Sequence, residues 1–163
     1  SIRRVAPEMA SPRAKTHNYL NFVMGDLEVQ SQNPDALAVL LDKNGNLAEG
    51  KGSNIFVIKG HKLITPKEKY VLPGVSREVT MNLGRELGYE IEEEDIDLFD
   101  AYNADELFIT STSFCICPVQ SINGRRPGAN VIPGPITKKL IDAYVNLVGF
   151  DWYEQYLSKI KDN

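Results

Sequence analysis

Between residues 35 and 66, apolar segments of strand length alternate with short turn signals, and few folds accommodate such a pattern. The segments DALAVLLD (35–42) and SNIFVIKG (53–60) flank an Asn-Gly pair, which is a strong signal for a tight hairpin turn. A second short turn leads into KLITP (62–66). We therefore expect three consecutive strands joined by tight turns, which is an antiparallel meander.

Helical periodicity occurs on both sides of this meander. The stripes are formed by Leu20, Val23, Met24 and Leu27 in the first segment and by Val75, Val79, Leu83 and Leu87 in the second. Pro34 ends the first helix, and Ser76 stands where the N-cap of the second would lie, with Gly88 as its stop. Residues 134–149 predict an amphipathic closing helix.

The remaining segments mix strands and helices. YEIEEEDI (89–96) predicts an edge strand with an acidic face, DLFDAYNAD (97–105) a short helix, and ELFITSTS (106–113) and CICPVQSI (115–122) further strands. The strict strand–helix alternation of a doubly wound parallel sheet is not found. We therefore predict an α+β fold, built round a curved or barrel-like, mixed or antiparallel sheet with surrounding helices.

Charge and composition limit the classes of function. The 163 residues carry a formal net charge of −4 and no long basic run, which argues against a nucleic-acid or anionic-membrane surface. No apolar segment approaches the roughly 18 residues that span a bilayer, so we expect a soluble, cytoplasmic protein that binds small molecules or other chains. Cys115 and Cys117 would point to opposite faces of a strand and cannot readily pair, and His17 and His61 lie too far off in sequence to suggest a metal site.

The opening residues 1–14, SIRRVAPEMASPRA, precede any periodic pattern and contain two prolines. Such a segment is typical of a linker that enters a domain, or of an extended arm that packs on it. We favour the linker, in which case residues 15–163 form one domain at the C-terminal end of a longer protein.

Several features could carry chemistry. Lys15 lies between the proline-bearing entry and the first helix, and Glu49 precedes a Gly-Lys-Gly run where the backbone can approach a ligand. Val75 and Ser76 mark a helix N-terminus, whose amides attract anions, and hydroxyl groups crowd residues 110–113 at a strand end. Taken singly, these are also ordinary features: a solvated lysine, a turn carboxylate, an N-cap and strand-end hydroxyls.

Together the four features match the needs of pyridoxal phosphate. Its aldehyde requires a lysine, its pyridine nitrogen requires an acid to stay protonated, and its phosphate requires neutral or positive donors. Glu49 then has a role that its glycine-rich neighbours do not explain.

Six motifs in a fixed order make the chain resemble the fold-type IV, or class IV, pyridoxal-phosphate aminotransferases. They are K-T-H-N-Y (15–19), L-A-E-G-K-G-S-N-I-F (47–56), L-P-G-V-S-R (72–77), A-D-E-L-F-I-T-S-T-S (104–113), P-V-Q-S-I-N-G (118–124) and G-P-I-T-K-K (134–139). That family includes branched-chain and D-amino acid aminotransferases, (R)-selective amine transaminases and aminodeoxychorismate lyase. The resemblance covers nearly the whole chain and implies the large domain of the D-amino acid aminotransferase-like fold.

The resemblance implies a role for each matching residue. Lys15 would form the Schiff base and move the proton between the substrate's Cα and C4′ of the cofactor, and Glu49 would pair with the protonated pyridine nitrogen. Leu72 would lie against the ring, and Tyr19 matches a tyrosine that bonds the cofactor's phenolate oxygen in branched-chain enzymes.

The resemblance also implies which residues bind the phosphate and the substrate. Val75 and Ser76 at the helix start and Thr112 would bind the phosphate, with Ser111 in the same cofactor-binding group. Amides around Thr112 and Ser113 would face the substrate carboxylate.

The function implied is transamination of a branched-chain or related aliphatic amino acid to its 2-oxo acid, with 2-oxoglutarate or pyruvate as acceptor. The alternatives are a D-amino acid or (R)-amine transaminase, aminodeoxychorismate lyase on the same scaffold, or a non-enzymatic binding module. Family members start with a smaller N-terminal domain and work as dimers or larger assemblies. By resemblance we therefore expect residues 1–14 to lead from such a domain, residues 15–163 to be the cofactor-binding large domain, and the protein to be a homo-oligomer.

Overall fold

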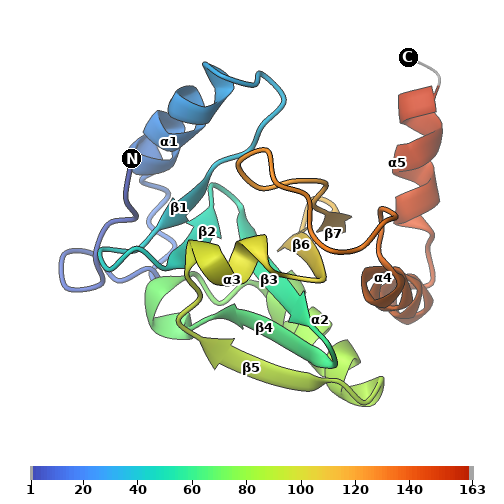
Figure 1. Ribbon diagram of the computed structural model, residues 1–163. Coiled ribbons are helices and arrows are strands. Elements are labelled where there is room, and N and C mark those ends of the chain that lie inside the picture. The colour runs from blue at the N-terminus through green and yellow to red at the C-terminus, as the bar shows by residue number, and fades with distance from the viewer. Residues whose placement is uncertain (1, 162–163) are drawn as a thin grey trace.

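The computed structural model describes residues 2–161 and has a seven-stranded sheet at its centre, with helices on both faces (Figure 1). The strands are β1 (Val39–Leu41), β2 (Leu47–Gly50), β3 (Ser53–Lys59), β4 (Lys62–Pro66), β5 (Glu90–Glu94), β6 (Glu106–Ser111) and β7 (Cys115–Pro118). The helices are α1 (Leu20–Gln30), α2 (Val75–Glu86), α3 (Leu98–Tyr102), α4 (Pro135–Val148) and α5 (Trp152–Lys161), with a short 3-10 helix at Glu68–Tyr70. The predicted α+β class is confirmed.

Strand β3 is the hub of the sheet because it pairs with three other strands. Along one edge it is antiparallel to β6, from Asn54 opposite Thr110 to Ile58 opposite Glu106. Along the other edge it pairs first with β2 and then with β4. Strand β5 runs parallel to β4 and forms the edge that the sequence predicted. Among the described residues the sheet branches at β3 and stays open, so it is a mixed sheet but not a closed barrel.

The region 35–66 contains one strand more than the sequence indicated. Strands β1, β3 and β4 were expected, and β2 lies between β1 and β3, antiparallel to both. Gly45 in the preceding turn takes a φ of 97°, the left-handed conformation that an Asn-Gly hairpin turn requires. Glu49 consequently lies in a paired strand and is not a solvated turn residue.

Side chains of β3 alternate between two core clusters, because successive strand residues point to opposite faces. Phe56 and Ile58 join the cluster beneath α2 and α4, where Phe56 stacks on Phe108 with ring centroids 4.8 Å apart. Ile55 and Val57 join the cluster on the face covered by α3. The strand is buried on both faces, which accounts for its continuous apolar sequence.

Helix α2 begins two residues earlier than the predicted N-cap at Ser76 implies. Gly74, in extended conformation, is the N-cap, and no side chain from residues 2–161 caps this end of the helix. The prediction that Ser76 is the N-cap is therefore wrong, because the Pro-Gly turn already places Gly74 at that position. Ser76 lies within the first turn and is buried.

Helix α1 confirms the helix predicted from its apolar stripe, but the stripe faces outward. Leu20 and Leu27 are 70% and 60% exposed, whereas Phe22 and Gly25 are buried. A Cβ at Gly25 would lie 2.6 Å from Cδ2 of Leu40, so the helix approaches β1 closely on that side.

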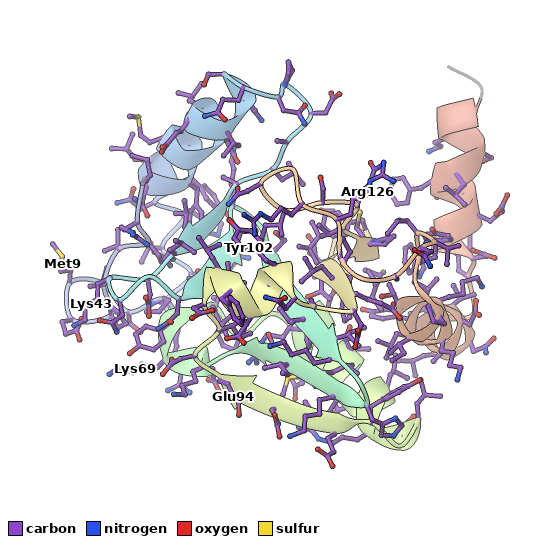
Figure 2. All side chains as sticks on the ribbon, viewed as in Figure 1. Met9, Lys43, Lys69, Glu94, Tyr102 and Arg126 are labelled. Carbon is purple, nitrogen blue, oxygen red and sulfur yellow. The ribbon has the colours of Figure 1, made fainter. Side chains whose placement is uncertain are left out.

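The segment before α1 packs on the domain, as the arm interpretation proposed. The Arg4 amide donates to the Leu41 carbonyl over 2.8 Å, and Arg3 forms a parallel bridge with Leu41. Further along, Lys43 Nζ lies 3.0 Å from Glu8 Oε1, and Lys43 and Met9 lie on the same side of the molecule (Figure 2). That this arm leads from another domain stays a prediction.

Cys115 and Cys117 lie in β7 and are free thiols. Cys115 packs against the core cluster beneath α2 and α4, and Cys117 packs against the opposite cluster. This confirms that they point to opposite faces. Within residues 2–161 we find no helix with the length and apolar character needed to cross a membrane.

Candidate functional site

A cavity of about 320 Å³ lies where the N-terminal arm meets the sheet. Its wall comes from segments far apart in the sequence: the arm, the β2–β3 turn, residues 72–76 at the start of α2, and the end of β6. The predicted site residues that line it are Lys15, Tyr19, Glu49, Leu72, Val75, Ser76, Ser111 and Thr112. Ser113 is the predicted site residue that the structure does not place on this wall.

Lys15 and Tyr19 reach the cavity from the loop before α1, and both are exposed. Between them, His17 has a φ of 59°, in the left-handed region that is uncommon for a residue with a side chain. The Tyr19 ring lies 5.9 Å from the His17 ring and 6.4 Å from the Phe22 ring, measured between centroids. The Lys15 amine is therefore carried on a tight turn at the rim of the cavity.

Glu49 is the buried anion of the cavity, with a side chain 6% exposed. Its Oε1 accepts a hydrogen bond from Arg4 Nε over 2.8 Å, and its Oε2 accepts one from the Leu72 amide over 2.8 Å. Each carboxylate oxygen can accept more than one hydrogen bond. Glu49 can therefore still accept a donor from a molecule in the cavity.

Burial raises the pKa of Glu49 above its ordinary value, because the carboxylate loses hydration. The Leu72 amide and the Arg4 guanidinium oppose this rise, since both stabilise the anion. Arg4 is held in turn by Phe22, whose ring centroid lies 4.9 Å from the guanidinium carbon.

The start of α2 presents backbone donors to the cavity. Amides in the first turn of a helix have no acceptor within the helix, so those of Val75 and Ser76 are available to an anion. Gly74 allows the chain to pass Asn54 closely, because a Cβ there would lie 2.3 Å from Asn54 Oδ1. Asn54 Nδ2 in turn donates to the Leu72 carbonyl over 3.0 Å.

Hydroxyl groups line the end of β6. Thr110 is 1% exposed, and its Oγ1 has no hydrogen-bond partner within the described part of the chain. Ser111 Oγ accepts from the Ser113 amide over 3.3 Å, while the Ser113 carbonyl accepts from the Tyr156 hydroxyl of α5 over 2.7 Å. Ser113 is thus bound to α5 rather than placed on the cavity wall.

The cavity wall combines groups of different charge. Glu49 supplies a buried carboxylate, and the start of α2 with the β6 hydroxyls supplies neutral donors and partial positive charge. A ligand that carries both a cationic ring and an anionic group matches this arrangement, and the Lys15 amine at the rim could react with it.

The sequence singled out neither Arg4 nor Asn54 as a site residue. Arg4 lay within the predicted linker, where a basic pair is the only signal. Asn54 had a usable signal, because it is a polar residue at the start of an otherwise apolar strand and polar residues seldom occur in buried strands without a partner.

Residues 1–122 match the sequence model of the family described as Amino-transferase class IV. The chain belongs to this family. A relative named putative branched-chain-amino-acid aminotransferase, from Methanocaldococcus jannaschii, is 40% identical over 148 residues, which is 90% of this chain and 51% of the relative. The class IV resemblance drawn from the motifs is confirmed.

Solved structures agree with this family. The branched-chain amino acid aminotransferase of Thermobaculum terrenum in its PLP-form superimposes with a TM-score of 0.84 at 36% identity, over 91% of this chain and 48% of that one. The branched-chain aminotransferase of Thermoproteus uzoniensis with norvaline gives a TM-score of 0.81 at 34% identity, over 97% of this chain and 52% of that one. The chain spans about half the length of these class IV relatives.

Proposed function

We propose that this chain is the cofactor-binding part of a pyridoxal-phosphate-dependent aminotransferase, acting on branched-chain or related aliphatic amino acids with 2-oxoglutarate or pyruvate as acceptor. The observation that carries the proposal is the convergence of Lys15, the buried Glu49 and the start of α2 on one cavity. The names of the M. jannaschii and T. terrenum relatives and the norvaline in the T. uzoniensis structure support the substrate class.

The residues present fit the cofactor. The cavity volume of about 320 Å³ lies at the lower end of the range for ligand pockets, roughly 300–1,000 Å³. The donors at the start of α2 suit a phosphate, and Glu49 suits a protonated ring nitrogen. Thr110 is part of the cavity wall, and its buried hydroxyl, which has no partner among residues 2–161, could bond a polar group of the cofactor.

The predicted residues on the cavity wall would each hold one part of the cofactor. Val75 and Ser76, together with Ser111 and Thr112, would hold the phosphate. Leu72 would lie beside the ring, and Tyr19 would stand near its phenolate oxygen. For the substrate carboxylate we propose the amides around Thr112 and Ser113, of which Thr112 is on the cavity wall and Ser113 follows it in the chain.

When bound, pyridoxal phosphate supplies an electron sink that stabilises negative charge at the substrate's Cα. Lys15 would carry the covalent attachment and, once released, its Nζ would take the proton from Cα of the amino acid. Lys15 is exposed at the rim, so it can reach both the cofactor and an incoming substrate. Glu49 would keep the ring nitrogen protonated, because a buried carboxylate favours a cation at its side.

Assembly, location and the further domain stay predictions. The outward apolar residues of α1 support a homo-oligomer, which light scattering of the full-length protein would detect. Cell fractionation would test the predicted cytoplasmic location. The proposed N-terminal domain is tested directly by the sequence that precedes Ser1 in the gene.

The proposal is tested by reducing the full-length protein with borohydride in the presence of pyridoxal phosphate and mapping the modified peptide. We expect a pyridoxyl adduct on Lys15 and its loss in Lys15→Ala. Lys51 is a matched control, because it also lines the cavity and is exposed. Lys51→Ala should keep the adduct, and an adduct on another lysine in the unaltered protein would contradict the proposal.

The reaction class is tested by supplying leucine, valine or isoleucine with 2-oxoglutarate or pyruvate and measuring the 2-oxo acid formed. Glu49→Gln should keep cofactor binding largely intact but slow turnover by about 10²–10³-fold, because the amide cannot hold a positive ring nitrogen. Unchanged turnover would show that the Glu49 carboxylate has only a structural role. Release of pyruvate from an amino-chorismate without an amino acceptor would instead indicate the lyase.

A further inference from the structure

Arg4 lies in the arm, yet its guanidinium reaches a carboxylate 45 residues further along the chain. Its Nε donates to Oε1 of Glu49 over 2.8 Å, and its side chain is only 14% exposed. This ion pair is therefore largely withdrawn from water, where a charge–charge interaction is stronger than at the surface.

Arg4 is fixed in place from both sides of the arm. Its amide donates to the Leu41 carbonyl of β1 over 2.8 Å. Asn21 of α1 accepts from the Val5 amide over 3.2 Å and donates to the Arg3 carbonyl over 2.6 Å. The backbone around Arg4 is thereby held between β1 and α1, so its guanidinium meets Glu49 in a defined geometry.

The surroundings of Glu49 contain other titratable groups besides Arg4. Those on the cavity wall are Lys15, His17, Tyr19 and Lys51, those on α1 are Asp26 and Glu28, and the one in β3 is Lys59. Asp26 and Glu28 accept from backbone amides, and Lys59 pairs with Asp100. Arg4 is the charged side chain that shifts the pKa of Glu49.

We propose that Arg4 is a positioning residue that keeps the buried Glu49 carboxylate ionised and aims its remaining lone pairs into the cavity. Burial alone favours the neutral acid, and a neutral acid cannot stabilise a cation. The inference rests on the proposed function, because an ionised Glu49 is what a protonated ring nitrogen requires. It also makes the charge of the site depend on docking of the N-terminal arm.

The test follows the protonation of Glu49 directly. Full-length protein labelled with ¹³C at the glutamate carboxyl carbon is titrated by NMR without cofactor, and the Glu49 signal is assigned by its loss in Glu49→Gln. We expect Glu49 to be ionised at neutral pH in the unaltered protein. In Arg4→Met, which keeps an apolar stem against Phe22, the proton affinity of Glu49 should rise about tenfold or more.

Two control variants separate charge from packing. Arg4→Lys keeps the positive charge and should hold the proton affinity of Glu49 within about threefold of the unaltered value. Arg3→Met removes the exposed neighbouring charge and should leave the affinity unchanged. A Glu49 that is already protonated at neutral pH in the unaltered protein would overturn the proposal, whether or not the Arg4 variants fold. A titration of Glu49 in Arg4→Met equal to that in Arg3→Met would also overturn it.

A second measurement uses the holoprotein. The pH dependence of the visible absorbance of bound pyridoxal phosphate should move in Arg4→Met and return in Arg4→Lys, which a purely structural role would not produce. Absorbance curves that coincide in all variants would overturn the role proposed for Arg4. A protein that never binds pyridoxal phosphate refutes the proposed function, while the NMR titration still decides whether Arg4 keeps Glu49 ionised.

Discussion

The hydroxyl of Tyr144 on α4 donates a hydrogen bond to the Ser76 hydroxyl on α2 over 3.3 Å, and both residues are buried. The bond joins the closing helix to the end of α2 that faces the cavity. Tyr144 also packs edge-on against Trp152 of α5, with ring centroids 6.2 Å apart. Two C-terminal helices therefore support a site whose other parts lie within the first 112 residues.

We expect Tyr144→Phe to weaken pyridoxal-phosphate binding several-fold, because the Ser76 hydroxyl loses the partner that orients it. The free energy of unfolding should fall by about 0.5–1.5 kcal/mol, the usual net value of one hydrogen bond. Fluorescence titration and urea unfolding measure the two effects. Tyr153→Phe is the control, since Tyr153 also contacts Trp152 but forms no hydrogen bond to Ser76 within the described part of the chain. Equal cofactor affinity in the two variants would show that Tyr144 does not support cofactor binding.

Thr110→Val should change stability and binding in opposite directions. Without cofactor, the variant should gain about 1 kcal/mol in free energy of unfolding, because it removes a buried hydroxyl that lacks a partner among the described residues. With cofactor, it should bind pyridoxal phosphate more weakly, because Thr110 is a residue of the cavity wall and its hydroxyl would be available to the ligand.

Thr137 provides the matched control for Thr110. Its hydroxyl is also buried and has no partner in the described part of the chain, but it lies in α4, away from the cavity wall. Thr137→Val should stabilise the protein similarly and leave cofactor affinity unchanged. A Thr110→Val protein that binds cofactor like Thr137→Val would show that no ligand uses the Thr110 hydroxyl.

Gly74→Ala should disturb the start of α2. The new Cβ would lie 2.3 Å from Oδ1 of Asn54, which is buried and bonded to the Leu72 carbonyl and so cannot move freely. We expect a loss of about 1–3 kcal/mol in free energy of unfolding and weaker cofactor binding. Gly52→Ala, also on the cavity wall but with open space around its Cβ, should stay within about 0.5 kcal/mol. Equal stability of the two variants in urea unfolding would contradict the crowding.

Glu49 should make stability depend on pH. Because its pKa is raised in the folded state, the folded protein binds the proton more tightly than the unfolded chain. Its stabilising contribution is therefore full below the ordinary value of 4.5 and is lost as pH rises through the folded pKa. The free energy of unfolding of the cofactor-free protein, measured relative to Glu49→Gln, should fall across this window.

Glu94→Gln is the control for that measurement, since Glu94 is exposed on β5 (Figure 2). The difference between Glu94→Gln and the unaltered protein should not follow pH in the same way. A difference between the unaltered protein and Glu49→Gln that stays flat, or rises with pH, would contradict the effect of burial on Glu49.

Elements whose own sequence carries an apolar pattern could be predicted, and elements that form because neighbouring elements pair or pack with them could not. Strand β3 is a continuous apolar run, and helices α1, α2 and α4 carry their own apolar periodicity. Strand β2 contains Glu49 and Gly50, which have weak strand preference, and becomes a strand because β1 and β3 pair with it on both sides. Helix α5, which the sequence did not predict, begins where Trp152 packs on Tyr144.

The candidate site likewise contains residues that local motifs predict and contacts that only the fold creates. Lys15, Glu49 and the start of α2 belong to local motifs, and the fold brings these motifs to one cavity. The contact between Arg4 and Glu49 depends on how an arm without periodicity docks, and no local pattern encodes that. Motif spacing also does not reveal that the carbonyl of Ser113, next to the cavity-lining Thr112, accepts a hydrogen bond from Tyr156 of α5.

The branching of the sheet at β3 sets where this protein can be re-engineered. An insertion or deletion of one residue in β3 would exchange the faces of Ile55 and Phe56 and shift three strand pairings at once. The same slip would move Asn54 off the Leu72 carbonyl. Libraries aimed at new substrates should therefore vary exposed positions of the arm and of the β2–β3 turn, and keep the length of β3 constant.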